Sequence, residues 1–67
     1  MKLLDVVALT QSVPEKHLNR GQVGTIVEEL NVGVYEVEFS NLDGKTYAMA
    51  ALEEKYLMPL IHDAIAA

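Results

Sequence analysis

Alternation of apolar and acidic residues is clearest in the middle of the chain. Between residues 34 and 39, Tyr35, Val37 and Phe39 alternate with Glu36 and Glu38. Successive side chains of a strand point to opposite faces of its sheet. The pattern therefore predicts a half-buried antiparallel strand with one apolar face in the core and one acidic face outside.

Four further segments have the apolar, β-branched composition of strands. They span residues 4–9, 23–30, 45–52 and 57–60. In the third segment Tyr47 and Met49 share a face, and we expect Tyr47 in the core. The last segment contains Pro59, which predicts a position at a sheet edge, because proline cannot donate to the hydrogen-bond ladder.

Turn residues separate these segments. Five positions have the residue types that turns and close backbone contacts require: Gly21, Gly24, Asn31, Gly33 and Gly44. Gly24 lies inside a predicted strand, which indicates a bend, a bulge or a close backbone approach. Asn31 and Gly33 both tolerate the positive φ of a tight hairpin. The Asp-Gly pair ending at Gly44 predicts a second hairpin, and residues 53–56 suit one turn of 3₁₀ helix.

Five short strands, two tight hairpins and one long loop predict an all-β fold. A sheet this short must curl to hide its edges and enclose a core. We therefore predict a small five-stranded SH3-like barrel with a long first loop and a short 3₁₀ turn before the last strand. This domain spans residues 1–60, and residues 61–67 form a C-terminal tail of helical composition that is too short to be stable alone.

Charge narrows the class of partner. The chain has ten acidic and five basic residues, a net charge of −5. Nucleic-acid binding derives much of its affinity from cations that meet phosphates, and the cations here are scattered along the chain. The composition therefore disfavours nucleic acid as the main partner and favours another protein or a second copy of the chain.

Several kinds of site lack the residues they need. The chain contains no cysteine, and its two histidines, His17 and His62, lie far apart, so we predict no metal and no cofactor. No hydroxyl, histidine and acid form a nucleophilic constellation, so we predict no enzyme and no catalytic residue. The N-terminus is not a secretory signal and no apolar run has the length of a membrane span. A soluble, cytoplasmic protein that does not bind membranes is the expectation.

Two segments are candidate partner-binding surfaces. The first is the loop that contains Val13, Lys16, Leu18 and Arg20. Its apolar residues allow two interpretations: exposed anchors for a partner, or a lid folded back on the barrel. The second is the acidic strand face with Glu36 and Glu38, which is either a solvated face or a surface that recruits a basic partner.

Four parts of the chain together resemble a known family. They are residues 5–9 (Asp-Val-Val-Ala-Leu), residues 20–27 followed by the strand 33–39, Asp43-Gly44-Lys45-Thr46, and Leu57-Met58-Pro59-Leu60. This ordered set, over residues 3 to 60, resembles the bacterial domain of unknown function 4926 (DUF4926). The resemblance implies an SH3-like fold and carries over no catalytic residue.

Two functional hypotheses follow. The first is a non-catalytic protein–protein interaction module, one form of which is the small acidic partner of a basic protein, as in antitoxins and immunity proteins. The second is a KOW-like nucleic-acid or ribosome-associated domain. It rests on the Gly-x-x-Gly-Thr-Ile-Val segment from Gly21 and on Lys16, Arg20 and Lys45.

Overall fold

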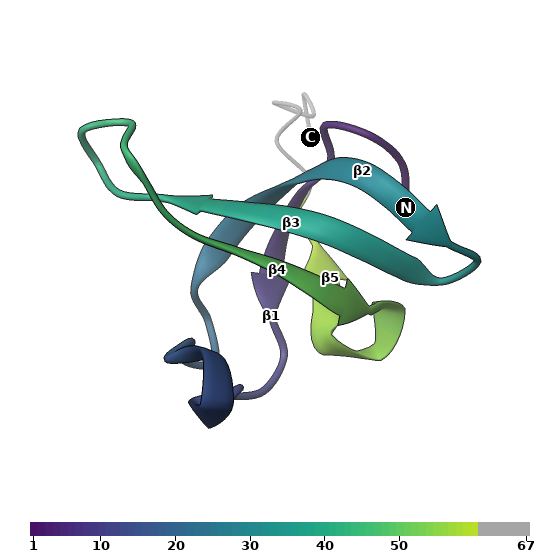
Figure 1. Cartoon of the computed structure of the whole chain (residues 1–67), viewed down its shortest axis with the longest axis horizontal. Coiled ribbons are helices and arrows are strands. Elements are labelled where there is room, and N and C mark those ends of the chain that lie inside the picture. Colours follow the sequence, from purple (N-terminus) through teal and green to yellow (C-terminus); the bar gives the residue numbers. More distant parts are fainter. Residues whose placement is uncertain (61–67) are drawn as a thin grey trace, which may run out of the picture.

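The computed structural model describes residues 1–60. Its elements, in chain order, are β1 (Val6–Leu9), η1 (Pro14–Lys16), β2 (Val23–Asn31), β3 (Val34–Ser40), β4 (Thr46–Glu53), η2 (Glu54–Tyr56) and β5 (Leu57–Pro59), where η marks a 3₁₀ helix. All strand pairs are antiparallel, and the strands follow the order β4-β3-β2-β1-β5 (Figure 1). The all-β prediction is confirmed. The predicted tail lies outside the described residues.

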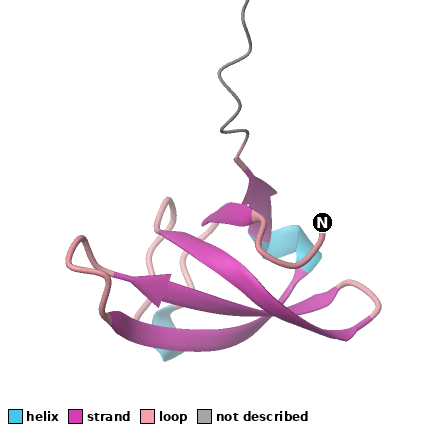
Figure 2. Cartoon of the chain, turned by 90° about the horizontal axis from the view of Figure 1, so that it is seen from above, coloured by secondary structure: helices cyan, strands magenta, loops and turns pink. Residues whose placement is uncertain are grey.

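The sheet is strongly curled. The long β2 pairs with β1 through its first residues and with β3 along most of its length, so the β3–β4 ribbon crosses over β1 and β5 (Figures 1 and 2). The strand number, the long first loop and the 3₁₀ turn before β5 agree with an SH3-like barrel. The barrel is open, because its edges β4 and β5 do not pair.

A single apolar cluster fills the inside of the curl. Tyr35, Val37 and Phe39 are at most 4% exposed, which confirms the alternation of β3. The cluster consists of Val7, Leu9, Val13, Leu18, Ile26, Tyr35, Val37, Phe39, Ala50, Leu52 and Leu57. All five strands and the first loop contribute to it, so the loop is part of the fold.

The prediction that Tyr47 lies in the core is wrong. Its side chain is 48% exposed. Phe39 pairs with Ala48 whereas Ser40 pairs with Thr46, so the register shifts by one residue and Tyr47 is the extra residue of a β-bulge. Tyr47 faces outward because the buried residues of β3, Phe39, Val37 and Tyr35, pair with Ala48, Ala50 and Leu52. Alternate residues of a strand point to opposite faces, so the face of β4 that Tyr47 shares with Met49 is the solvent face.

The turns largely follow the predicted chemistry. In the β3–β4 hairpin the Asn41 Oδ1 accepts hydrogen bonds from the backbone N–H groups of Asp43 (2.9 Å) and Lys45 (3.0 Å). In the β2–β3 hairpin, Gly33 adopts a φ of +74°. Asn31 tolerates a positive φ but does not adopt one. It is the last residue of β2, and its Oδ1 accepts a hydrogen bond from the Val32 N–H at 2.8 Å.

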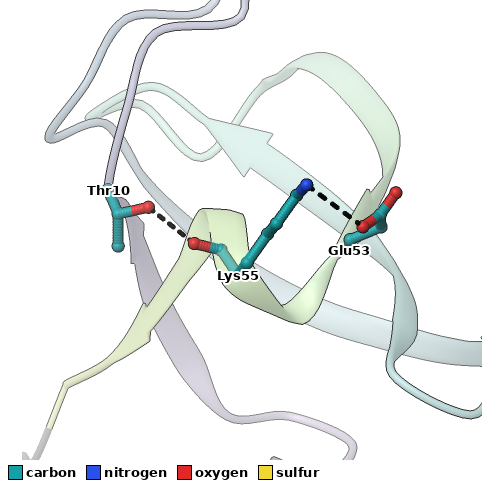
Figure 3. A network of polar contacts seen from close by, with 3 residues as sticks. All are labelled: Thr10, Glu53 and Lys55. Atoms are coloured by element: carbon teal, nitrogen blue, oxygen red, sulfur yellow. Dashed lines mark hydrogen bonds and ion pairs between the residues drawn. The ribbon is translucent and has the colours of Figure 1, made fainter.

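A polar contact joins the end of β1 to η2 (Figure 3). Thr10 donates from Oγ1 to the carbonyl of Lys55 at 2.9 Å, and its N–H donates to the carbonyl of Tyr56 at 2.9 Å. These bonds hold the chain reversal that leads from β4 into β5. The adjacent Lys55–Glu53 ion pair, at 3.7 Å, joins two exposed side chains and contributes little stability.

The first strand begins later than the sequence predicts. Residues 2–5 form a turn in which the Lys2 N–H donates to Asp5 Oδ2 at 2.9 Å and the Asp5 N–H donates to the Lys2 carbonyl at 3.1 Å. Leu4 has a φ of +71° and is 74% exposed. A bulky residue rarely adopts this conformation, because its Cβ crowds the following carbonyl oxygen.

Leu4→Gly should therefore stabilise the protein. Relief of the left-handed strain is worth about 1–2 kcal/mol, and the larger chain entropy of unfolded glycine offsets about 0.5–1 kcal/mol of it. We expect a net gain of about 0.5–1 kcal/mol in the free energy of unfolding, measured by urea denaturation. Leu3→Gly, at a position without positive φ, is the control and should not stabilise.

Candidate interaction surface

The first loop folds back on the core and acts as a lid. Val13 and Leu18 are 5% and 1% exposed. They form an isolated β-bridge. The Val13 N–H donates to the Leu18 carbonyl at 2.8 Å, and the Leu18 N–H donates to the Val13 carbonyl at 3.2 Å. The lid interpretation is therefore confirmed, and the interpretation of Val13 and Leu18 as exposed anchors is wrong. An isolated apolar pair in a polar loop is compatible with both roles, so the sequence could not decide.

The two cations of the loop remain on the surface. Lys16 ends η1 and Arg20 follows the lid, and both are exposed. The Arg20 N–H donates to Ser12 Oγ at 3.1 Å, which orders this part of the loop. Neither cation pairs with Glu36 or Glu38, so the structure does not unite the two predicted surfaces.

Carboxylates gather on the outer face of the sheet, the face opposite Tyr35, Val37 and Phe39. Glu36 and Glu38 lie there on β3. The register places Glu28 of β2 directly opposite Glu36, and Glu53 of β4 opposite Val34 on the same face. We call these four residues, Glu28, Glu36, Glu38 and Glu53, the acidic face.

The acidic face carries an electrostatic cost. Directly opposed residues of antiparallel strands have Cβ atoms about 5 Å apart, and like charges at that distance destabilise a sheet. Within residues 1–60 no cation pairs with Glu28, Glu36 or Glu38, and only Lys55 approaches Glu53. The strands themselves do not need these charges, because polar neutral residues would serve the solvent-facing positions equally well.

Apolar side chains adjoin the acidic face. Met49 of β4 lies opposite Glu38 and is 53% exposed, and Ala51 lies opposite Glu36. Contact with the surface of a partner would bury Met49, and the surrounding carboxylates would favour a positively charged partner surface. This combination of an apolar contact with flanking charges is typical of protein interfaces.

Glu28 and Glu53 are the members of this face that the sequence prediction missed. A register shift between Ile26 and Glu28 moves Glu28 to the position opposite Glu36. The pattern of β2 alone does not contain this shift. The only available signal was the repeated occurrence of glutamate in neighbouring strands.

On the inner side of the sheet, burial and nearby carboxylates change the pKa of the Tyr35 phenol. Burial, followed by the negative charges of Glu29, Glu54 and Asp5, raises the pKa of the Tyr35 phenol above its ordinary value of 10.0. Its hydroxyl donates to the Met1 carbonyl at 3.4 Å. The folded protein therefore favours the neutral phenol.

This pKa predicts a loss of stability in alkali. The unfolded phenol ionises near pH 10 and the folded one at higher pH, so the contribution of Tyr35 is complete below pH 10 and falls as the pH rises through the folded pKa. Tyr35→Phe should flatten this part of the curve. The check is urea denaturation of both proteins between about pH 9 and pH 11.5; parallel curves would contradict the expectation.

An open groove borders the acidic face. It is lined by Met1, Lys2, Leu3, Val27, Glu28 and Glu29.

Within the part of the chain that the structure describes, no three histidine, cysteine or acidic side chains come together as a metal site. His17 is exposed, and His62 lies outside the described residues. Among residues 1–60 no helix is long and apolar enough to cross a membrane.

Comparison with known families decides the classification. The family model described as "Domain of unknown function (DUF4926)" matches residues 3–59. The chain belongs to the DUF4926 family. The match begins in the N-terminal turn and ends with the last residue of β5, so this DUF4926 domain includes the whole sheet and the lid. No curated protein and no solved structure matches the chain significantly.

Proposed function

We propose that this DUF4926 protein is a non-catalytic protein–protein interaction module whose acidic face binds a basic surface of another protein in the cytoplasm. The observation that carries the proposal is the direct opposition of Glu28 and Glu36 across β2 and β3, with Glu38 on the same face. Like charges in this arrangement weaken the sheet. A cationic partner turns the same charges into a source of affinity.

Electrostatic complementarity would act mainly on the rate and choice of association. Clustered charges of one sign steer an oppositely charged partner and reject partners of like charge. Met49 beside Glu38 would supply apolar contact at the centre of the interface. One concrete form of this function is an antitoxin or immunity protein that covers a basic toxin surface.

A matched pair of variants tests the proposal. Glu36→Gln/Glu38→Gln removes two carboxylates from the acidic face. Glu15→Gln/Asp43→Asn removes two from exposed positions in the first loop and the β3–β4 hairpin. Both variants change the net charge equally, so only the position of the charge differs. Tagged full-length chains capture proteins from a lysate of the source organism, and quantitative mass spectrometry compares them with the unmodified chain.

We expect the unmodified chain to capture one stoichiometric basic protein. The control variant should retain this protein, and the Glu36→Gln/Glu38→Gln variant should lose it. The free energy of unfolding of Glu36→Gln/Glu38→Gln should meanwhile rise by about 0.5–1 kcal/mol, because repulsion across the strands is removed. Gain of stability with loss of the partner identifies the charges as functional. Equal capture by both variants would contradict the proposal.

A second candidate function is the KOW-like nucleic-acid domain. The antiparallel order places the first loop and the β3–β4 hairpin at the same end of the sheet. Lys16, Arg20 and Lys45 therefore lie at one end of the molecule. The net charge of −5 opposes this function, and we rank it below the protein interaction.

A further inference from the structure

The first loop, residues 10–22, is tied mainly to itself. It extends beyond the ends of β1 and β2 and contains η1 (Figure 1). Two sets of hydrogen bonds join its arms: the bridge between Val13 and Leu18, and the bond of 3.1 Å from the Arg20 N–H to Ser12 Oγ. Because these bonds lie inside the loop, they persist when the loop moves relative to the sheet. The loop can therefore move as one body.

Few contacts hold this body against the sheet. Between residues 11 and 20 only Val13 and Leu18 are buried, and both belong to the apolar cluster. The backbone hydrogen bonds from the loop to β1 lie at its base. There the Gly21 N–H donates to the Leu9 carbonyl at 2.8 Å, and the Leu9 N–H donates to the Gln22 carbonyl at 2.9 Å. The position of the loop tip therefore depends on two apolar side chains.

The Gln22 side chain adds a polar link between the loop and β4. Its Nε2 donates to the Tyr47 hydroxyl at 2.9 Å, and its Oε1 accepts a hydrogen bond from the Asn19 N–H. One side chain thus orders the last turn of the loop and fastens that turn to an edge strand. Within residues 1–60 it makes the one side-chain hydrogen bond between the loop and β4.

We propose that the first loop opens and closes as a unit, and that the hydrogen bond between Gln22 and Tyr47 is the latch that favours the closed state. Opening brings Val13 and Leu18 to the surface. Gly21 is the hinge: its φ is +91°, and no heavy atom lies within 4 Å of a Cβ placed there. Glycine changes its backbone conformation at little steric cost, and nothing packed against it resists the change.

Opening of the loop costs less free energy than unfolding of the sheet, because it exposes only two buried side chains and leaves the strand ladders intact. The acidic face contains no residue of the loop. The proposal is therefore independent of the proposed function, and it is tested on the purified full chain without a partner.

Amide hydrogen exchange, followed by NMR, tests the opening. The Val13 and Leu18 N–H groups share the bridge, so opening of the loop as a unit gives them equal opening constants. We expect these constants to exceed that of the Val37 N–H, in a strand paired on both sides, by on the order of tenfold or more. Unequal constants for Val13 and Leu18, or one constant for all three amides, would overturn the proposal.

Tyr47→Phe tests the latch, because it removes the hydroxyl that accepts the bond from Gln22. The opening constants of Val13 and Leu18 should rise about two- to tenfold, the effect of one hydrogen bond, with that of Val37 unchanged. Tyr56→Phe is the matched control. It removes a hydroxyl that has no hydrogen-bond partner among residues 1–60, and the constants should change by less than about twofold. Equal effects of the two variants would show that Tyr47 is not part of a latch.

A double variant tests whether the two side chains act through one bond. Gln22→Ala also raises the opening constants, and addition of Tyr47→Phe to it should raise them no further, because the bond is already lost. Independent, multiplying effects of the two substitutions would overturn the assignment of Gln22 and Tyr47 as partners in the latch.

Discussion

Replacement of Leu18 by alanine should destabilise the protein by about 2–5 kcal/mol, the largest effect that we expect of any single truncation in the first loop. Leu18 is 1% exposed and belongs to the same cluster as Phe39 and Val37. The loss combines the transfer free energy of the removed methyl groups with the cavity that remains. For a domain of this size the loss is a large fraction of the total stability.

Urea denaturation followed by circular dichroism measures the effect on the isolated protein. Leu42→Ala removes the same atoms from a fully exposed position in the β3–β4 turn and should change stability by less than about 0.5 kcal/mol. The comparison separates a lid from a binding anchor. An anchor would lose partner affinity without loss of stability, so a Leu18→Ala protein as stable as Leu42→Ala would contradict the lid.

Gly24→Ala should destabilise the sheet by about 3 kcal/mol, at the upper end of the cost of overpacking. A Cβ at this position would meet the Val37 Cγ1 at 2.7 Å, the Glu38 carbonyl oxygen at 2.9 Å and the Phe39 Cδ1 at 2.9 Å. The oxygen belongs to the β3 backbone and cannot move without loss of its ladder. The close approach lies where β2 passes between its two neighbours, so the missing side chain allows the curl.

Thermal and urea unfolding of Gly24→Ala provide the measurement. Val23→Ala is the neighbouring control, because Val23 is 46% exposed and its truncation removes little packing. The Gly24 backbone is not in the left-handed region, so any loss reports steric contact alone. Equal stabilities of Gly24→Ala and Val23→Ala would show that β2 and β3 do not approach so closely.

Local patterns predicted the elements that depend on local physics. The alternation of Tyr35, Val37 and Phe39 with glutamates identified β3 and its buried face. Gly24, inside a predicted strand, indicated the close backbone approach to β3. Pro59 indicated an edge strand. In each case a short local pattern or a single residue restricts the backbone or its burial, whatever the remainder of the chain does.

Features that depend on pairing between strands could not be predicted. Tyr47 is the type of residue that a core contains, but the pairing of Phe39 with Ala48 and of Val37 with Ala50 places Tyr47 on the solvent face of β4. Glu28 reaches Glu36 only because the β2–β3 register shifts after Ile26. Leu4 continues the apolar run of β1, yet a left-handed turn removes it from the strand. Register results from the sum of many side-chain contacts, which no single segment contains.

The most direct test of the central claim, that this DUF4926 protein binds another protein, is affinity capture of the tagged full chain from the source organism. The lysate is divided, one half is treated with nuclease, and bound proteins are quantified by mass spectrometry. We predict one stoichiometric basic protein in both halves. Recovery of ribosomal proteins or RNA, lost on nuclease treatment, would contradict the account and establish the nucleic-acid alternative.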